Sequence, residues 1–233
     1  MDAVSPTGSS ASSELAPFPI PMSGAFFQLE CHDGVRVLRL QSPDGTNRLS
    51  RACVLSLTAQ ITDLATEGVP LIITGNDRFF SAGADLEEIC ALDGASAYEF
   101  SQIGQTLMQA VDSFPTPVFA AVSGYCMGGG LDLALACDHR IAHPHAIFGH
   151  RGAALGLITG WGGTQRLPRL IGKARALEMF VAAEKVHAER ALAIGLVDAI
   201  ASDPVNAAIE QIAHAWRSSA FSSIAPFRPA GIP

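Results

Sequence analysis

The 233-residue sequence contains few charged residues, few aromatic residues and no long hydrophobic run. Charged residues make up 16% of the chain and aromatic residues 7%, whereas hydrophobic residues reach 48%. This composition excludes a chain that is mainly disordered, because it holds enough apolar surface to offset the entropy lost on folding. No stretch of about 18 uncharged apolar residues is present, so we expect no membrane-spanning helix.

Basic residues are also scarce, with 15 Lys and Arg against 22 Asp and Glu, which gives a net charge of −7. Binding to nucleic acid or to an anionic membrane surface requires clustered positive charge. We therefore expect neither nucleic acid nor a membrane as a partner.

The five cysteines form no Cys-x-x-Cys pair, and their number is odd. These features argue against a disulfide framework and predict reduced, buried thiols in a cytoplasmic protein. The N-terminus carries no basic segment before an apolar one, so it is not expected to be a secretory signal.

Composition divides the chain into three parts. Residues 1–24 are rich in Ser, Ala and Pro and predict a flexible leader, since proline blocks regular structure. Residues 25–200 form the predicted core domain, and residues 201–233 a shortened C-terminal helical segment with a Pro-rich tail.

Hydrophobic periodicity within the core predicts alternating strands and helices. Two short strands are expected to turn at Asp33-Gly34, because Asp-Gly favours a tight hairpin. The other expected elements are a helix at 51–66, a strand at 69–74, a helix at 97–113, a strand at 117–123, and helices at 164–182, 187–195 and 203–218. Strands that alternate with helices pair in parallel, so the predicted class is α/β.

Two glycine-containing turns each connect a buried strand to a helix. They are FFSAGADL at 79–86 and GYCMGGGLDL at 124–133. The three glycines of the second turn leave unpaired backbone N–H groups at a helix N-terminus, where they favour negative charge. One N–H group from each turn, pointed at one position, would form an oxyanion hole. Glycines before a helix also occur as ordinary turns, and these match neither a dinucleotide fingerprint nor a P-loop.

Four segments resemble the crotonase (enoyl-CoA hydratase/isomerase) superfamily in order and spacing. They are FFSAGADLEEI, AAVSGYCMGGGLDLALACDHRIA, FGHRGAALGLITGWGGTQRLPRLIGKARALEMF and HAERALAIGLVDAI. The resemblance implies a spiral of strand–strand–helix units with C-terminal helices, assembled as a homotrimer or a dimer of trimers. It also implies an acyl-CoA substrate, with coenzyme A as part of the substrate, no separate cofactor and no metal.

The resemblance assigns the oxyanion hole to the backbone N–H groups of Ala84 and Gly129. Residues implied to contact the coenzyme A thioester are Arg48, Leu49, Ala82, Gly83, Ala84, Asp85, Leu86, Glu87, Gly128 and Gly129. The positive charge of Arg48 also suits a phosphate contact.

The chain departs from the family pattern at the catalytic carboxylates. The hydratases of the family use two glutamates, whose positions correspond to Asp132 and Gly152. Asp132 retains a carboxylate and is the expected general acid or base, whereas a glycine transfers no proton. The dienoyl-CoA isomerases of the family place further carboxylates at Gly152 and Gly160, and the aryl dehalogenases place an aspartate at Gly160.

Three functions remain open from the sequence. One is an enoyl-CoA hydratase/isomerase-type enzyme, and another is a one-base isomerase or decarboxylase, which needs mainly the hole and one carboxylate. The third is a catalytically weak acyl-CoA-binding homologue. Glu87, Glu88 and His150 are further candidates for a base, each with a structural or surface role as its alternative.

Overall fold

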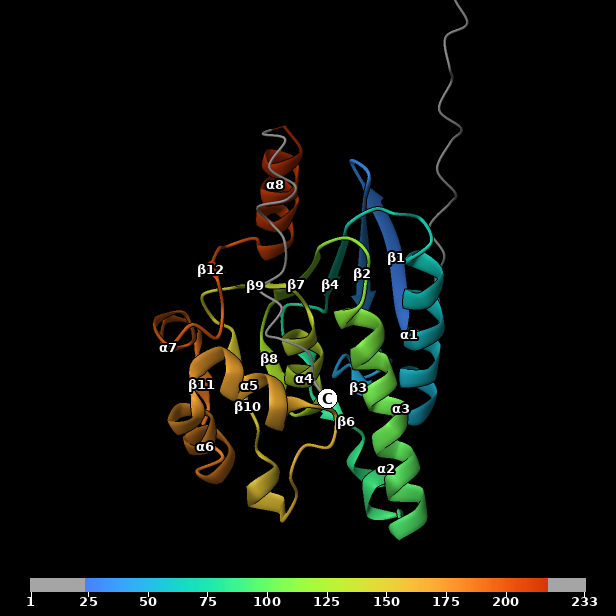
Figure 1. Cartoon of the computed structure of the whole chain (residues 1–233), viewed down its shortest axis with the longest axis vertical. Coiled ribbons are helices and arrows are strands. Elements are labelled where there is room, and N and C mark those ends of the chain that lie inside the picture. Colours follow the sequence, from blue (N-terminus) through green and yellow to red (C-terminus); the bar gives the residue numbers. More distant parts are fainter. Residues whose placement is uncertain (1–23, 218–233) are drawn as a thin grey trace, which may run out of the picture.

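The computed structural model of the protein describes residues 24–217 as a layered α/β fold (Figure 1). The predicted leader, except Gly24, and the Pro-rich tail lie outside the described residues. The main sheet has the order β1-β2-β4-β7-β9-β12, and a second sheet has the order β11-β10-β8-β5. The strands are β1 (Phe27–His32), β2 (Val35–Leu40), β3 (Arg48–Leu49), β4 (Leu71–Thr74), β5 (Phe79–Ser81), β6 (Gly83–Ala84), β7 (Val118–Val122), β8 (Tyr125–Met127), β9 (His139–Ala142), β10 (Ile147–Gly149), β11 (Val186–His187) and β12 (Ala199–Ile200).

The helices lie between and around these sheets. They are α1 (Arg51–Leu64), α2 (Leu86–Cys90), α3 (Gly94–Asp112), α4 (Gly129–Ala136), the 3-10 turn η1 (Gly152–Leu155), α5 (Gly163–Ile171), α6 (Lys173–Val181), α7 (Ala188–Ala193) and α8 (Pro204–Arg217).

The N-terminal hairpin forms as the Asp-Gly pair predicts. β1 pairs antiparallel with β2, with His32 opposite Val35. Asp33 and Gly34 both have positive φ, 49° and 80°, which is the backbone shape of a tight two-residue hairpin turn.

The remaining strands of the main sheet pair in parallel, as the alternation of strands and helices predicts. β4 pairs with β2 and β7, and β9 pairs with β7 and β12. Every residue of β4 and β7 is buried, because helices cover both faces of the sheet. α1 and α3 contribute to the core on one face, and α8 packs on the opposite face.

The prediction of a single helix at 164–182 is wrong in one respect, because the structure has two helices there, α5 and α6. The chain breaks at Gly172, whose φ of +87° is incompatible with a continuous right-handed helix. This break turns α6 back so that Phe180 can lie against the functional site described below.

The expectation of five buried thiols was also wrong in part. Cys53, Cys126 and Cys137 are buried, whereas Cys31 is partly buried and Cys90 is exposed. Within the described residues, no helix is both long enough and apolar enough to cross a membrane.

Candidate functional site

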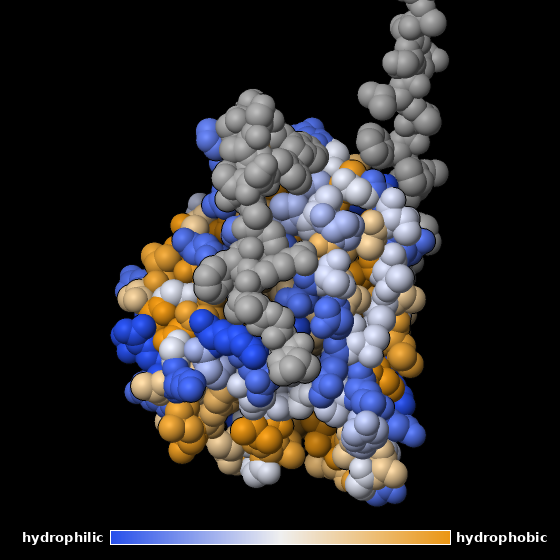
Figure 2. All heavy atoms as spheres, in the orientation of Figure 1, coloured by the Kyte–Doolittle hydropathy of each residue, from blue (hydrophilic) through white to orange (hydrophobic). Residues whose placement is uncertain are grey.

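Both glycine turns open onto a cavity of about 670 Å³. Figure 2 shows hydrophobic side chains gathered at the lower edge of the molecule, between α6 and α2 of Figure 1. The apolar side chains that line the cavity include Leu86, Ile89, Phe100, Leu155, Leu157, Ile158, Trp161, Leu177 and Phe180. Asp132 is the sole carboxylic acid among the described residues that line the cavity. A large apolar cavity with few polar groups is typical of a small-molecule site.

The first turn is fixed by a buried hydrogen-bonded network. The Ser81 hydroxyl donates to the Asn47 carbonyl at 2.7 Å and accepts from the Gly83 N–H at 3.0 Å. Gly83 has a φ of +95°, and a Cβ there would lie 2.6 Å from the Met127 carbonyl and 3.1 Å from the Gly129 nitrogen. Only a glycine therefore allows the first turn to approach the second this closely.

The second turn places the start of α4 at the cavity. Gly128 has a φ of +50°, and its N–H donates to the Gly149 carbonyl at 2.9 Å. Gly129 is the first residue of α4, so its N–H has no partner within the helix. A Cβ on Gly129 would lie 3.3 Å from the Ala84 nitrogen, so the two predicted oxyanion donors lie close together.

Trp161 forms one wall of the site and packs against two glycines. A Cβ on Gly104 or on Gly129 would lie 2.1 Å or 2.4 Å, respectively, from the indole ring. The indole Nε1–H donates to the Phe100 carbonyl at 3.2 Å, and the two rings lie 5.3 Å apart. The ring is therefore held in place from both sides.

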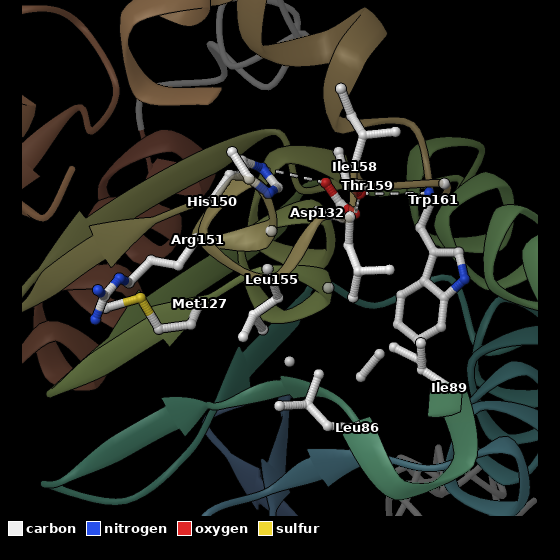
Figure 3. Close-up of a pocket in the computed structure, with 18 of the residues that line it drawn as sticks. Leu86, Ile89, Met127, Asp132, His150, Arg151, Leu155, Ile158, Thr159 and Trp161 are labelled. Carbon is white, nitrogen blue, oxygen red and sulfur yellow. Dashed lines mark hydrogen bonds and ion pairs between the residues drawn. The ribbon is translucent and has the colours of Figure 1, made fainter. Parts of the chain in front are cut away.

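Asp132 is buried beside these turns, with 1% of the residue exposed. Burial raises the pKa of its carboxyl to about 7, although a hydrogen bond from Thr159, the charge of Arg166 and the Gly163 amide act in the opposite direction. Thr159 donates its hydroxyl to Asp132 Oδ2 (Figure 3). A carboxyl with this pKa can both give and take a proton near neutral pH.

His150 lies on the other side of the same carboxyl. Its Nε2 is 3.4 Å from Asp132 Oδ1 (Figure 3). Its ring packs 5.0 Å from that of Phe180. Burial lowers the pKa of His150 to about 4. Near neutral pH the imidazole of His150 is therefore neutral.

These two pKa values predict a specific dependence of stability on pH. Between about pH 4 and 6.5 the unfolded chain carries one proton on His150, whose ordinary pKa is 6.5. The folded chain carries one proton on Asp132, whose pKa rises from 3.8 to about 7. The two groups therefore contribute almost no net slope there, since stability rises with pH only where the unfolded state binds more protons.

Replacing either residue alone is expected to reveal the contribution of the other to the pH dependence of stability. With Asp132→Asn, the free energy of unfolding should rise by about 3 kcal/mol from pH 4 to 6.5, relative to the unaltered chain. With His150→Gln it should instead fall by about 4 kcal/mol from pH 4 to 7. Urea unfolding at several pH values measures both slopes, and parallel curves for the two variants would contradict the assignment.

The structure brings together seven of the residues predicted from the sequence. Asp132 lines the cavity together with Ala82, Gly83, Ala84, Leu86, Gly128 and Gly129. The other four predicted residues lie outside its lining. They are Arg48, Leu49, Asp85 and Glu87.

These four residues have identifiable positions next to the site. Leu49 is fully buried in the core, so only its backbone could reach a ligand. The exposed Arg48 pairs with Asp44, and its guanidinium lies 3.7 Å from the carboxylate of Asp85, which caps α2. Glu87 is exposed.

The alternative bases differ in their positions. Glu88 accepts the Arg51 N–H at 2.7 Å and so stabilises the start of α1, outside the cavity lining. His150 alone among Glu87, Glu88 and His150 lines the cavity. Within the described chain, no three His, Cys, Asp or Glu side chains are grouped so that they could hold a metal ion.

Sequence reasoning missed Thr159 and Gly163. A Cβ on Gly163 would lie 2.1 Å from Asp132 Oδ1 and 2.9 Å from His150 Nε2. Gly163 therefore makes room for the pair, and the adjacent glycines at 162 and 163 were the only signal of it. Nothing in the sequence around Thr159 indicated its contact with Asp132.

Two successive units share one arrangement: β4 leads through β5 and β6 to α2, and β7 leads through β8 to α4. Both helices line the same cavity, and this arrangement defines a crotonase-type fold. A sequence profile described as "Enoyl-CoA hydratase/isomerase" matches residues 30–227. The chain belongs to the enoyl-CoA hydratase/isomerase family.

Two curated relatives have names that specify hydration. The crotonyl-CoA hydratase of Syntrophomonas wolfei is 38% identical over 175 residues, which are 74% of this chain and 67% of that protein. The probable enoyl-CoA hydratase of Bacillus subtilis is 42% identical over 172 residues, which are 72% of this chain and 66% of that protein. These matches thus span about two thirds of each relative.

Solved structures agree with the fold. Pseudomonas aeruginosa DspI superposes with a TM-score of 0.79 at 35% identity, covering 89% of this chain and 78% of that chain. The enoyl-CoA hydratase of Bacillus anthracis superposes with a TM-score of 0.77 at 34% identity, covering 81% and 75%. The crotonase-type fold predicted from the sequence is confirmed.

Proposed function

We propose that this chain processes acyl-CoA thioesters as an enzyme of the enoyl-CoA hydratase/isomerase type. The observation that carries the proposal is the position of Asp132, a buried carboxyl that lines an apolar cavity at the start of α4. The N–H groups of Ala84 and Gly129 hold the thioester oxygen as it becomes an enolate. Asp132 transfers a proton at the α-carbon.

The surroundings favour this chemistry. Hydrogen-bond donors fixed in a water-poor site stabilise developing negative charge more strongly than donors in water. The start of α4 adds the positive end of a helix dipole. The raised pKa of Asp132, about 7, suits proton transfer in either direction.

The coenzyme A portion lies along the first turn in this proposal. Arg48 contacts a phosphate, and the backbone from Ala82 to Glu87 contacts the adenine and pantetheine. The proposed assembly is a homotrimer or a dimer of trimers in the cytoplasm, without a further cofactor.

A panel of acyl-CoA thioesters incubated in heavy water tests the proposal. Saturated, 2-enoyl, 3-enoyl and malonyl-type thioesters report α-proton exchange, hydration, double-bond shift and loss of CO₂ by mass spectrometry. We expect at least one reaction, and we expect Asp132→Asn to slow it by about 10³-fold, within the range of about 10²–10⁴-fold that a general acid or base contributes.

Asp93→Asn is the matched control, because Asp93 is an exposed carboxylate whose capping of α3 an asparagine can maintain. Equal rates for Asp132→Asn and the unaltered chain would contradict the role of Asp132.

Tight acyl-CoA binding with no reaction would support the second candidate, an acyl-CoA-binding homologue. That candidate is favoured by Gly152, which leaves one carboxyl in the described lining.

A further inference from the structure

The position that supplies a second carboxylate in the hydratases cannot accept a side chain here without rearrangement. A Cβ on Gly152 would lie 2.6 Å from the Leu157 carbonyl oxygen. The Leu157 N–H in turn donates to the Gly152 carbonyl at 2.8 Å, which closes the turn tightly. A second proton-transfer group must therefore come from another residue.

Few side chains in the cavity can fill this role. Besides Asp132, the described lining contains two side chains that can carry a charge, His150 and Arg151. An arginine stays protonated in proteins and is a poor base. The hydroxyl of Ser101 already donates to the Gly160 carbonyl at 3.0 Å. His150 is the remaining group in the lining that can act as a base, because burial lowers the pKa of its imidazole and keeps it neutral near neutral pH.

Thr159 determines where a proton on Asp132 can lie. Its hydroxyl oxygen accepts a hydrogen bond from the backbone N–H of Trp161 at 3.5 Å, while its own hydroxyl hydrogen is donated to Asp132 Oδ2. Oδ2 is thus an acceptor, so a proton on the carboxyl belongs on Oδ1. Oδ1 faces His150 Nε2 at 3.4 Å, and both of these buried atoms are without a hydrogen-bond partner in the described structure.

We propose that His150 and Asp132 act as a two-group acid–base pair, in which the imidazole replaces the carboxylate absent at Gly152. This inference rests on the proposed function. His150 Nε2 takes a proton from water as the water oxygen bonds to C3 of a 2-enoyl thioester. The electron pair of the double bond moves to the thioester oxygen, which forms the enolate.

The second half of the step restores the pair. The enolate collapses and C2 takes the proton from Asp132 Oδ1, so water has been added across the double bond. His150 is then protonated and Asp132 ionised, and the proton returns from Nε2 to Oδ1 directly. The charge of Arg166 on α5 also acts on Asp132, and the pKa of the Cys126 thiol on β8 is raised by burial and also by the charge of Asp132.

His150→Gln tests the pair, with crotonyl-CoA as the probe. We expect kcat for hydration to fall by about 100-fold while KM changes less than about threefold, since general base catalysis contributes this much. The limb of the pH–rate profile at acidic pH, which reports the base, should disappear. Exchange of the α-proton of a saturated acyl-CoA in heavy water should persist, because it requires Asp132 and not His150.

His139→Gln is the matched control, since His139 is a partly buried histidine that stacks on Phe119 at 4.7 Å, outside the cavity lining. If the unaltered chain hydrates crotonyl-CoA and His150→Gln does so equally well, the pair is wrong while the proposed function stands. If the unaltered chain neither hydrates the probe nor exchanges α-protons, the proposed function itself is wrong.

A spectroscopic measurement keeps the test decisive should His150→Gln fold poorly. With both chains labelled with ¹⁵N-histidine, we expect the His150 Nε2 resonance of the Asp132→Asn variant to differ from that of the unaltered chain, since asparagine is isosteric with aspartate but carries no acidic group. An unchanged resonance would overturn the pair.

Discussion

Gly129→Ala is expected to lower kcat for any acyl-CoA reaction by about 10⁴-fold. The added Cβ would lie 3.3 Å from the Ala84 nitrogen and 2.4 Å from the indole ring of Trp161. The ring cannot retreat, because Gly104 closes its other side. Both oxyanion donors would therefore be displaced, and loss of each donor costs about 10²–10³-fold. Steady-state kinetics with crotonyl-CoA measures the effect.

A double variant separates this effect from general damage to the core. Trp161→Leu removes the ring that the new methyl group meets, so the double variant should be no less heat-stable than Trp161→Leu alone. Its activity should remain far below that of Trp161→Leu, because the methyl group still crowds Ala84. Equal activity of the double variant and Trp161→Leu would exclude Gly129 from the oxyanion hole.

Gly163→Ala is expected to reduce kcat by about 10³-fold through the acid–base pair. Its Cβ would lie 2.1 Å from Asp132 Oδ1, which forces the carboxyl away from His150. Loss of a positioned acid or base costs about 10²–10⁴-fold. Gly163 has no positive φ, and alanine favours a helix more than glycine by about 1 kcal/mol, so the backbone itself does not oppose the change.

Gly94→Ala is the matched control for this prediction. Gly94 is likewise the first residue of a helix. Apart from its chain neighbours and the backbone of its own helix, no atom lies within 4 Å of the position that an alanine methyl group would occupy there. This variant should leave kcat unchanged and slightly raise the unfolding midpoint. A fully active Gly163→Ala variant would contradict the geometry of the pair. A large loss of kcat in both variants would instead indicate that activity is sensitive to alanine at the first residue of any helix.

The architecture was largely predictable because its signals are local. Asp33-Gly34 specifies its hairpin through backbone conformation, and the apolar runs before the two glycine turns became the buried strands β4 and β7. The division at Gly172 was missed, since the apolar periodicity continues across a residue whose φ of +87° ends the helix.

The glycine turns and Asp132 were predictable from the sequence, but the contacts of the Asp132 side chain were not. The glycine turns predict free N–H groups at one position, whereas the assignment of the donors to Ala84 and Gly129, and of the acid or base to Asp132 in the first turn of α4, comes from the family resemblance. The contacts of Asp132 with Thr159 and His150 depend on how the segment before α5 packs against α4, 27 residues away in the case of Thr159. Such packing depends on the missing side chain of Gly163, of which the adjacent glycines at 162 and 163 are the only sign in the sequence.

The parallel sheet also has a kinetic consequence, because its partners are far apart in the chain. The Thr74 hydroxyl donates to the carbonyl of Ala121, 47 residues later, and the Arg140 N–H donates to the Asp198 carboxylate, 58 residues later. The chain must lose the conformational entropy of closing such loops before these hydrogen bonds can stabilise it. Folding is therefore slower than in a helical bundle of equal length. During that interval β4 and β7, whose residues are all buried at the end, expose hydrophobic strand edges to other chains.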